Sequence, residues 1–293
     1  MPPHHSKQLN IILWNCNSLE PRIDELHAFA HDRVYEPDMM LLTETRLHPD
    51  WIGTGWRWLE QKLKVAKYRN YLYAHHSGYG GISAYVRDSV SHRKAPAKWQ
   101  PIHRPAHSKC YLQWFEVRVP LLPEAIMIGV CYIPPEGSSR YKFERDRDWF
   151  AANVNYVASR RHCVLSGDFN ARHEEFGEIE GAAANNARGA WLRDLMLPLQ
   201  MECLNYTWLD GDYTHIASNA QHSNSMIDLV FTNAPGIIYD IEVMRDTVLV
   251  SDHLPLRIVV KHLMPSCLSR SVHVRCMTYT VQLMSSGSSM ITI

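Results

Sequence analysis

The chain has 293 residues, of which 46% are hydrophobic, and its formal net charge at pH 7 is zero. A chain of this length and composition can bury a large core, which predicts one large domain or two small ones. Proteins that coat nucleic acid through phosphate contacts are usually basic, so the neutral balance argues against that class. It leaves open an enzyme whose site carboxylates offset basic residues elsewhere.

The cysteines and the N-terminus indicate a reducing compartment. The seven cysteines are scattered and form no Cys-x-x-Cys pair, and several lie in apolar runs, as buried free thiols do. Residues 1–8 form a polar segment without an apolar signal region, and the longest apolar run, residues 125–133, is too short to cross a bilayer. We therefore expect an intracellular, soluble protein without a membrane partner.

Apolar runs bounded by turn residues predict most of the strands. In chain order these strands cover residues 9–14, 39–43, 71–74, 81–86, 111–119, 125–132, 164–165, 225–231, 248–250 and 254–260. Gly78, Gly80 and Gly81 supply the turn before the strand at residues 81–86. The aromatic, glycine-punctuated residues 51–58 are interpreted as a loop.

Three helices are predicted between these strands. The first covers about residues 20–33, with Ser18 as its cap and Pro21 in its first turn. The second covers about residues 140–158 and the third residues 187–197. The second is expected to bury four of its side chains, namely Phe143, Phe150, Val154 and Val157.

The stretch from Val164 to Asn170 is the most informative for function. Its apolar start predicts a short buried strand, and Gly167 permits a sharp turn where that strand ends. If the segment stays extended, Asp168 and Asn170 point to the same side. An aspartate can accept a proton or bind a metal, and an asparagine can donate to a phosphate oxygen. The alternative is an ordinary Asx-rich turn.

Alternating strands and helices with hairpins predict an α/β layered domain over residues 9–262. Beyond it, residues 263–293 are rich in Ser, contain no Asp or Glu and show no clear period. We interpret this tail as disordered or as a foreign end. The polar clusters of the domain stand at predicted strand ends, where open sheets place their sites.

Five polar clusters carry the candidate chemistry: Asn15 with Asn17, Glu44, Tyr132, Asp168 with Asn170, and Asp228 with Asp252 and His253. Carboxylates and amides without clustered Cys or His favour Mg²⁺ or Mn²⁺ over zinc. Phosphodiester hydrolysis needs a metal to offset charge, a group that orients or deprotonates water, and neutral donors to phosphate oxygens. The clusters contain all three kinds of group. A cationic His253 could hold a phosphate oxygen, with Asp228 orienting it.

Each cluster also has an ordinary structural interpretation. Glu44 could be a solvated acid after a strand, Tyr132 a packing residue, and the Asp252-His253 pair a turn or cap. Asn15 could be a strand-end turn. Asp228 is harder to explain in this way, because it lies in an apolar run and a buried carboxylate needs a partner.

The ordered motifs resemble the endonuclease/exonuclease/phosphatase superfamily (DNase I-like). More narrowly, they resemble the apurinic/apyrimidinic-endonuclease-like domain of non-LTR (LINE-type) retrotransposons. The resemblance spans about residues 9–260 in the family's order. Gly-Asp-Phe-Asn and Ser-Asp-His together are the specific signal. The motifs are Leu13-Trp14-Asn15, Leu42-Thr43-Glu44-Thr45, Cys131-Tyr132-Ile133-Pro134, Gly167-Asp168-Phe169-Asn170, Ile227-Asp228-Leu229 and Ser251-Asp252-His253-Leu254-Pro255.

The resemblance implies a four-layer α/β sandwich with two mixed, largely antiparallel central sheets flanked by helices. It implies a monomeric, Mg²⁺- or Mn²⁺-dependent endonuclease that nicks DNA in the nucleus. The nick would leave a 3′-hydroxyl that primes reverse transcription by a reverse transcriptase domain of the parent element. Basic residues such as Arg22, Lys142 and Arg188 are candidate contacts to the DNA backbone.

The resemblance also implies a role for each site residue. Glu44 would be the main metal ligand, with Asp252 beside the metal. Asp168 would activate the water or serve the leaving oxygen, and Asp228 would pair with His253. The scissile phosphate would be contacted by Asn15, Asn170 and His253, assisted by Tyr132.

Three departures from the family pattern stand out. Asn17, a further candidate metal contact, stands where DNA-repair relatives often carry Asp, which weakens a second metal contact and favours the retroelement branch. Met226 stands where a repair enzyme often carries Arg, so recognition of abasic DNA is not expected. No reverse transcriptase motif follows Lys261, and we therefore expect a fragment, a truncated copy or a mispredicted gene.

Two other functions remain open on the sequence. One is a phosphatase or phosphodiesterase of the same fold on a non-nucleic-acid substrate, such as a lipid or inositol phosphate. The sequence argues against this alternative, because it has no obvious amphipathic membrane-binding segment and no Lys/Arg cluster beside the site motifs. The other is a non-functional retroelement remnant, against which the intact candidate residues argue.

Overall fold

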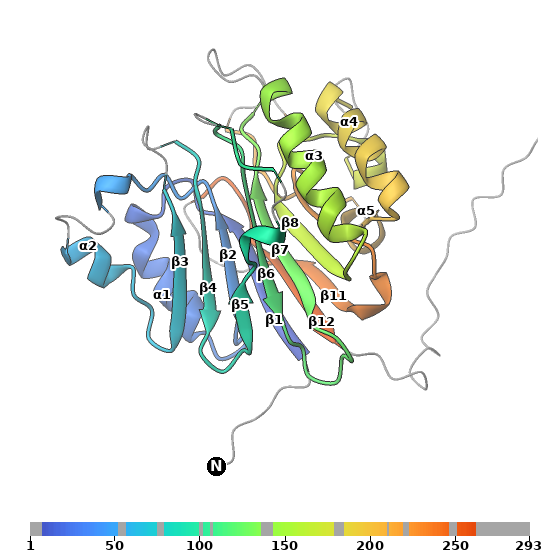
Figure 1. The fold of residues 1–293 in the computed structure, drawn as a ribbon. Helices are drawn as coiled ribbons and strands as arrows, with labels where there is room; N and C mark the ends of the chain where they lie inside the picture. Colours follow the sequence, from blue (N-terminus) through green and yellow to red (C-terminus); the bar gives the residue numbers. More distant parts are fainter. Residues whose placement is uncertain are drawn as a thin grey trace, which may run out of the picture. The chain divides into compact units, whose positions relative to one another are not determined.

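Two mixed sheets form the centre of the fold (Figure 1). The computed structural model describes residues 8–51, 57–74, 79–99, 102–105, 108–135, 143–178, 185–209, 211–218, 223–245 and 251–261. The predicted tail, the strand predicted at residues 248–250 and Gly78 lie outside the described residues. In the described part of the chain, no helix is long and apolar enough to cross a membrane.

Each sheet has six described strands. In the first, sheet A, the order is β11 (Ile238–Val243), β12 (Leu256–Lys261), β1 (Gln8–Asn15), β2 (Met39–Thr43), β4 (Ile82–Arg87) and β3 (Tyr68–Tyr73). In the second, sheet B, it is β5 (His92–Lys94), β6 (Tyr111–Val117), β7 (Ile126–Tyr132), β8 (Cys163–Asp168), β10 (Asp228–Thr232) and β9 (Glu202–Cys203). Among the described strands, β1 with β2 and β7 with β8 are the parallel pairs, and the other pairs are antiparallel.

Side-chain alternation in β1 explains how the layers form. Leu9, Ile11 and Leu13 belong to the main core with the residues of sheet B. Ile12 and Trp14 face the opposite way and pack in a second core with α1 (Ile23–His31). Because successive strand residues point to opposite faces, one fully apolar strand can join both cores.

Helices cover the outer faces of both sheets (Figure 1). α1 and α2 (Arg57–Lys62) lie beside sheet A, while α3 (Glu144–Ala158) and α4 (Ala187–Met196) lie beside sheet B. The arrangement confirms the predicted four-layer α/β sandwich. A short helix, α5 (Leu204–Trp208), and 3-10 turns complete the described elements: Glu20–Arg22, Pro49–Trp51, Ala97–Trp99, Glu174–Phe176, Leu197–Leu199 and Pro235–Ile237.

Some local predictions were wrong. Ser18 does not cap the first helix, because its backbone N–H donates to Glu44 O and a 3-10 turn precedes α1. The loop predicted at residues 51–58 is wrong at its end, because the helix α2 begins at Arg57. The strand predicted from residue 225 begins at Asp228. The pattern also missed β5, β9, β11 and α5.

Candidate active site

The two parallel strand pairs bring the predicted site residues to one edge. Asn15 ends β1 and Asp168 ends β8, and the parallel partner of β8 ends at Tyr132. Asp228 begins β10 and lies opposite Asp168 in the antiparallel register. Carboxyl ends of parallel strands meet at the same sheet edge. The Asn15 side-chain amide donates to Asp168 Oδ2 over 3.0 Å and so links sheet A to sheet B.

The turn after β8 differs from the sequence prediction. Gly167 lies within β8 and not in a turn, and a Cβ there would come within 2.0 Å of Cys131 O, so glycine is needed for close strand packing. Asn170 is not extended but left-handed, with φ 48°, a conformation that asparagine tolerates better than most residues. Its backbone N–H and side-chain amide each donate to Asp168, both over 2.9 Å.

Asp168 is an acid with an unusual environment. Its side chain is buried, and burial together with the nearby Asp228 and Glu44 carboxylates raises its pKa well above the usual range, while the charge of His253 opposes that shift. The donors on its oxygens come from Asn15 and Asn170. A raised pKa makes this carboxylate a stronger base than an ordinary aspartate, which suits it to accepting a proton.

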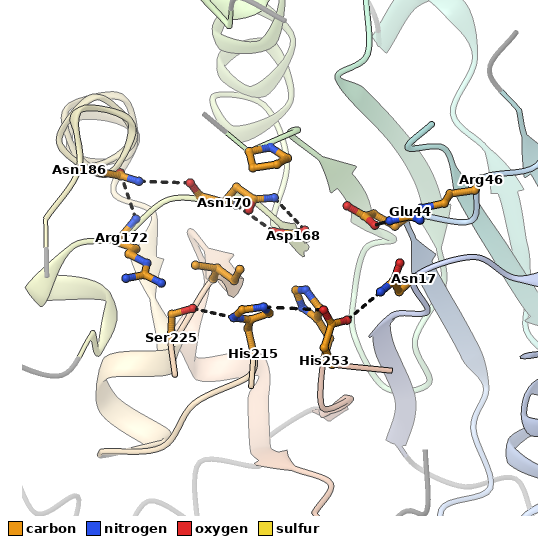
Figure 2. A pocket seen from close by; sticks show the side chains of 13 residues that line it. Asn17, Glu44, Arg46, Asp168, Asn170, Arg172, Asn186, His215, Ser225 and His253 are labelled. Atoms are coloured by element: carbon orange, nitrogen blue, oxygen red, sulfur yellow. Dashed lines mark hydrogen bonds and ion pairs between the residues drawn. The ribbon is translucent and has the colours of Figure 1, made fainter. Parts of the chain in front are cut away.

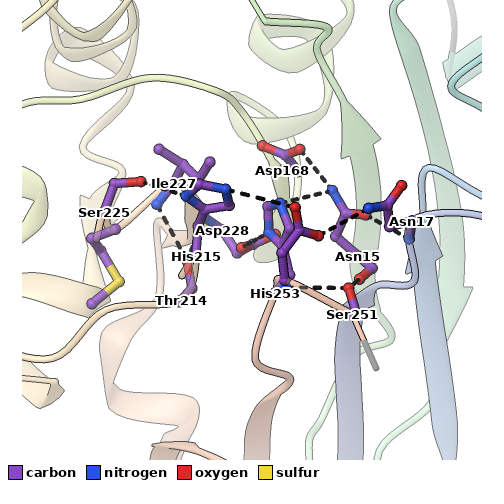
Figure 3. A network of polar contacts seen from close by, with 12 residues as sticks. Asn15, Asn17, Asp168, Thr214, His215, Ser225, Ile227, Asp228, Ser251 and His253 are labelled. Atoms are coloured by element: carbon purple, nitrogen blue, oxygen red, sulfur yellow. Dashed lines mark hydrogen bonds and ion pairs between the residues drawn. The ribbon is translucent and has the colours of Figure 1, made fainter. Parts of the chain in front are cut away.

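Asp228 and His253 form a buried pair (Figure 3). His253 Nδ1 lies 2.7 Å from Asp228 Oδ2, and Nε2 lies 3.4 Å from the Asn15 amide nitrogen. Burial lowers the pKa of His253, but the Asp228 carboxylate outweighs this and raises it to about 9. The ring is therefore cationic at neutral pH, and its two nitrogens are donors.

The backbone around this pair is fixed by polar contacts. Thr214 Oγ1 accepts from the backbone N–H of Asp228 over 3.1 Å. The Ser251 hydroxyl donates to Asn15 O over 2.7 Å and accepts from the His253 N–H over 3.2 Å. Three segments far apart in the chain thus hold His253 against Asp228.

Glu44 lies across the cleft from this pair. It has a left-handed backbone, with φ 49°. Its Oε1 accepts from the Tyr132 hydroxyl over 2.6 Å and its Oε2 from the Arg46 guanidinium over 2.8 Å. Burial and the Glu44 charge raise the pKa of Tyr132, so its hydroxyl stays protonated and donates. Asn17 donates its side-chain amide to Asp252 Oδ1 over 3.0 Å.

This donor set fits a hard divalent cation. Glu44 and Asp252 line the same cleft, with side chains 15% and 40% exposed. No group of three or more His, Cys, Asp or Glu side chains placed to hold a metal occurs among the described residues. Mg²⁺ usually keeps several waters and takes one or two carboxylates. Glu44 and Asp252 could therefore hold it, with Asn17 orienting Asp252.

A cleft of about 440 Å³ contains these groups (Figure 2). Of the predicted residues, Asn17, Glu44, Asp168, Asn170, Asp252 and His253 line it. The other three, Asn15, Tyr132 and Asp228, are buried and form hydrogen bonds with lining residues. The cleft therefore presents carboxylates, amides and a cationic imidazole to one bound group.

The sequence patterns missed several residues of the cleft: Arg46, Arg172, Asn186, His215 and Ser225. His215 lies beside His253, with ring centroids 4.8 Å apart, and its Nδ1 is 3.2 Å from Ser225 Oγ. Burial and the charge of His253 lower the pKa of His215. Isolated bridges to Ser225 and His253 hold this segment, and such bridges leave no periodic signal. One signal in the sequence could have identified Arg46, because it stands two positions after Glu44.

Two of the three basic residues predicted to contact the DNA backbone lie in the described part of the chain. Arg188 is buried, and its guanidinium donates to Phe169 O, so the expectation that it contacts DNA was wrong. Arg22 is only partly exposed, next to α1. Lys142 lies outside the described residues.

Sequence comparisons agree on one kind of relative. Residues 126–257 match the family described as endonuclease-reverse transcriptase. The chain is 25% identical over 289 residues to the probable RNA-directed DNA polymerase from transposon BS of Drosophila melanogaster. That match covers 94% of this chain and 27% of the Drosophila protein, so the chain spans only a minor part of its relative's length.

Solved structures share the fold. The AP endonuclease LMAP from Leishmania major aligns with a TM-score of 0.67 at 15% identity, over 88% of this chain and 89% of that chain. The endonuclease domain of TRAS1, a telomere-specific non-LTR retrotransposon, aligns with a TM-score of 0.61 at 16% identity, over 87% and 98%. At such identities the likeness establishes the two-sheet fold that the motifs predicted.

Proposed function

We propose that the chain, whose residues 126–257 match the family described as endonuclease-reverse transcriptase, is a metal-dependent endonuclease that nicks target DNA. The nick leaves a 3′-hydroxyl, which a reverse transcriptase domain of the parent element uses as a primer in the nucleus. The chain works as a monomer in this reaction. The observation that carries the proposal is the cluster at the sheet edges, where Asp168 lies between two amide donors and a cationic His253, opposite Glu44.

The residues divide the work of hydrolysis between them. Asp168 takes a proton from the attacking water, for which its raised pKa suits it. The water oxygen bonds to phosphorus as the bond from phosphorus to the 3′ oxygen breaks, and the leaving oxygen takes up a proton. Asn15 and Asn170 donate to phosphate oxygens.

His253 supplies the positive donor of the site. It donates from Nε2 to a phosphate oxygen, since Asp228 occupies Nδ1. Asp228 orients the ring and keeps it charged. Charge-assisted hydrogen bonds of this kind are roughly twice as strong as neutral ones.

Mg²⁺ or Mn²⁺, when bound, supplies Lewis-acid stabilisation of the charge on the phosphate. Glu44 would hold it, with Asp252 and Asn17 beside it. Tyr132 fixes the Glu44 carboxylate by its hydrogen bond, and Arg46 holds the other oxygen of that carboxylate. Ligating carboxylates are oriented in this way by their hydrogen-bonding partners.

Nicking of supercoiled plasmid tests this function. The purified chain should convert supercoiled to open-circular DNA with Mg²⁺ or Mn²⁺, and a chelator should stop it. A DNA polymerase should extend the nick directly, which reports a 3′-hydroxyl. Asp168→Asn should be inactive while keeping its fold. Full activity in chelator, or release of phosphate from small esters without nicking, would contradict the proposal.

A further inference from the structure

The start of α4 contacts the turn that carries Asp168 and Asn170. Asn186 is the N-cap of α4, and its Oδ1 accepts from the Gly189 N–H over 2.7 Å and from the Arg172 N–H over 3.2 Å. The Asn186 N–H donates back to Arg172 O over 3.0 Å. The cap of a helix is thus also bonded, in both directions, to the residue two positions after Asn170.

Arg188 extends this contact to the preceding residues. Its side chain is buried, 2% exposed, and Nη1 lies 3.2 Å from Phe169 O and 3.3 Å from Asn170 O. The Asn186 side-chain amide lies 3.4 Å from the same Asn170 carbonyl. The Arg188 guanidinium also lies over the Phe143 ring, 5.0 Å from the ring centroid. A buried charge needs such partners.

Gly189 lets the helix come this close. A Cβ at this position would lie 1.9 Å from Arg172 O, closer than any side chain permits. Within the sequence Asn186-Ala187-Arg188-Gly189, Asn186 therefore caps the helix and Arg188 is a buried donor to backbone carbonyls. Gly189 permits the close approach to Arg172. We call Asn186, Arg188 and Gly189 the α4 motif.

Contacts from outside the turn fix its backbone conformation. Asn170 has a positive φ of 48°, and in this conformation its N–H and side-chain amide both reach Asp168. Residues in sparsely populated backbone regions persist when the surroundings over-determine them. The α4 motif binds the carbonyls of Phe169 and Asn170 and both polar groups of the Arg172 backbone.

We propose that Asn186, Arg188 and Gly189 are positioning residues for phosphodiester hydrolysis, which hold Asn170 left-handed so that Asp168 and Asn170 face the substrate together. The inference rests on the proposed function. Arg188 acts through the turn and does not contact substrate, since it is buried beneath it. Asn186 also lines the cleft, and it holds the turn through its hydrogen bonds to the Arg172 and Asn170 backbones. Sub-ångström placement of catalytic groups governs rate, which is why a remote change can be felt at the site.

Two variants test the proposal. Arg188→Met keeps the aliphatic stem and removes the donor to both carbonyls. Asn186→Asp keeps the cap oxygen and removes the donor to Asn170 O. It tests the proposal by itself if Arg188→Met does not fold. We expect kcat for plasmid nicking to fall by about 10²-fold with KM for DNA roughly unchanged. Leu192→Ala, in the buried face of the same helix, is the control, and it should lower the melting temperature while sparing kcat.

Amide hydrogen exchange gives a readout without substrate. In wild type the Asn170 N–H is protected by Asp168 Oδ1. Both α4-motif variants should exchange this amide faster, while Leu192→Ala and the amides of β8 should match wild type. Unchanged Asn170 exchange in both variants, or a kcat equal to that of Leu192→Ala, would overturn the proposal. If wild type nicks no DNA, the proposed function fails, and the exchange result still decides whether the α4 motif orders the turn.

Discussion

The Tyr132 hydroxyl donates a 2.6 Å hydrogen bond to Glu44 Oε1, and this bond joins the end of a strand in one sheet to the loop after a strand in the other. The contact gives the tyrosine a defined task. It holds the carboxylate that we propose as the metal ligand.

Tyr132→Phe should therefore raise the Mg²⁺ requirement of nicking. Loss of a partner that orients a ligating carboxylate costs about 10- to 100-fold in metal affinity, so the half-saturating Mg²⁺ concentration should rise by about that factor. Tyr85→Phe is the matched control, because the Tyr85 hydroxyl is buried and has no hydrogen-bond partner in the described part of the chain. An unchanged Mg²⁺ titration in Tyr132→Phe would show that the bond does not serve the metal.

Asn15→Ala should lose activity without unfolding. The substitution removes the donor that links the sheets at Asp168, and loss of a transition-state donor costs about 10²-fold or more in kcat. Stability should fall by about 2 kcal/mol, because the substitution also removes the acceptor of the Asn17 N–H and each hydrogen bond has a net value of about 1 kcal/mol. Asn10→Ala, a buried amide in the same strand away from the cleft, should leave kcat intact. Equal kcat in both variants would refute the role of Asn15.

Asp228→Asn should change how stability depends on pH. The folded-state pKa of His253 is raised from 6.5 to about 9, so the stability that its proton provides is full below pH 6.5 and is lost as pH rises through about 9. The amount is on the order of 3 kcal/mol. In Asp228→Asn the pKa of His253 should fall, because burial still lowers it while the largest influence that raises it is gone, and the loss of stability over this window should shrink.

Thermal melts between pH 6 and pH 9.5 measure this effect, and NMR titration of the His253 ring reports its pKa directly. Asp240→Asn removes a carboxylate that lies 3.6 Å from Arg257 on another strand, and it should leave the pH profile as in wild type. His253→Ala should cost about 10²-fold or more in turnover. Identical pH profiles for Asp228→Asn and wild type would show that Asp228 does not charge the ring.

DNA affinity should depend only modestly on salt. The chain is neutral overall, so it should neutralise fewer phosphates than the 6 to 10 or so of strongly basic binders. Arg172 lines the cleft with its side chain 23% exposed. Arg172→Ala should reduce the slope of log affinity against log salt by about 1, whereas Arg93→Ala, paired with Glu116 on β6, should not. A wild-type slope typical of ten phosphate contacts would contradict this.

The sequence by itself determined the layers and the strand ends that carry the site. The apolar runs that end at Asn15, Thr43 and Tyr132 are β1, β2 and β7. Hydrophobic runs of strand length are local signals, so they can be found without knowing the fold. Because β1 with β2 and β7 with β8 are parallel, their polar ends meet at one edge.

Only the tertiary structure decided how these ends meet. Asn15 and Asp168 are 153 positions apart, and their bond crosses from one sheet to the other. Arg188 looked like a surface cation in the sequence, yet the turn after β8 buries it. The left-handed backbones of Glu44 and Asn170 also have no periodic signature. Contacts between distant segments, and loop conformations fixed by those contacts, depend on the whole fold and so leave no local pattern.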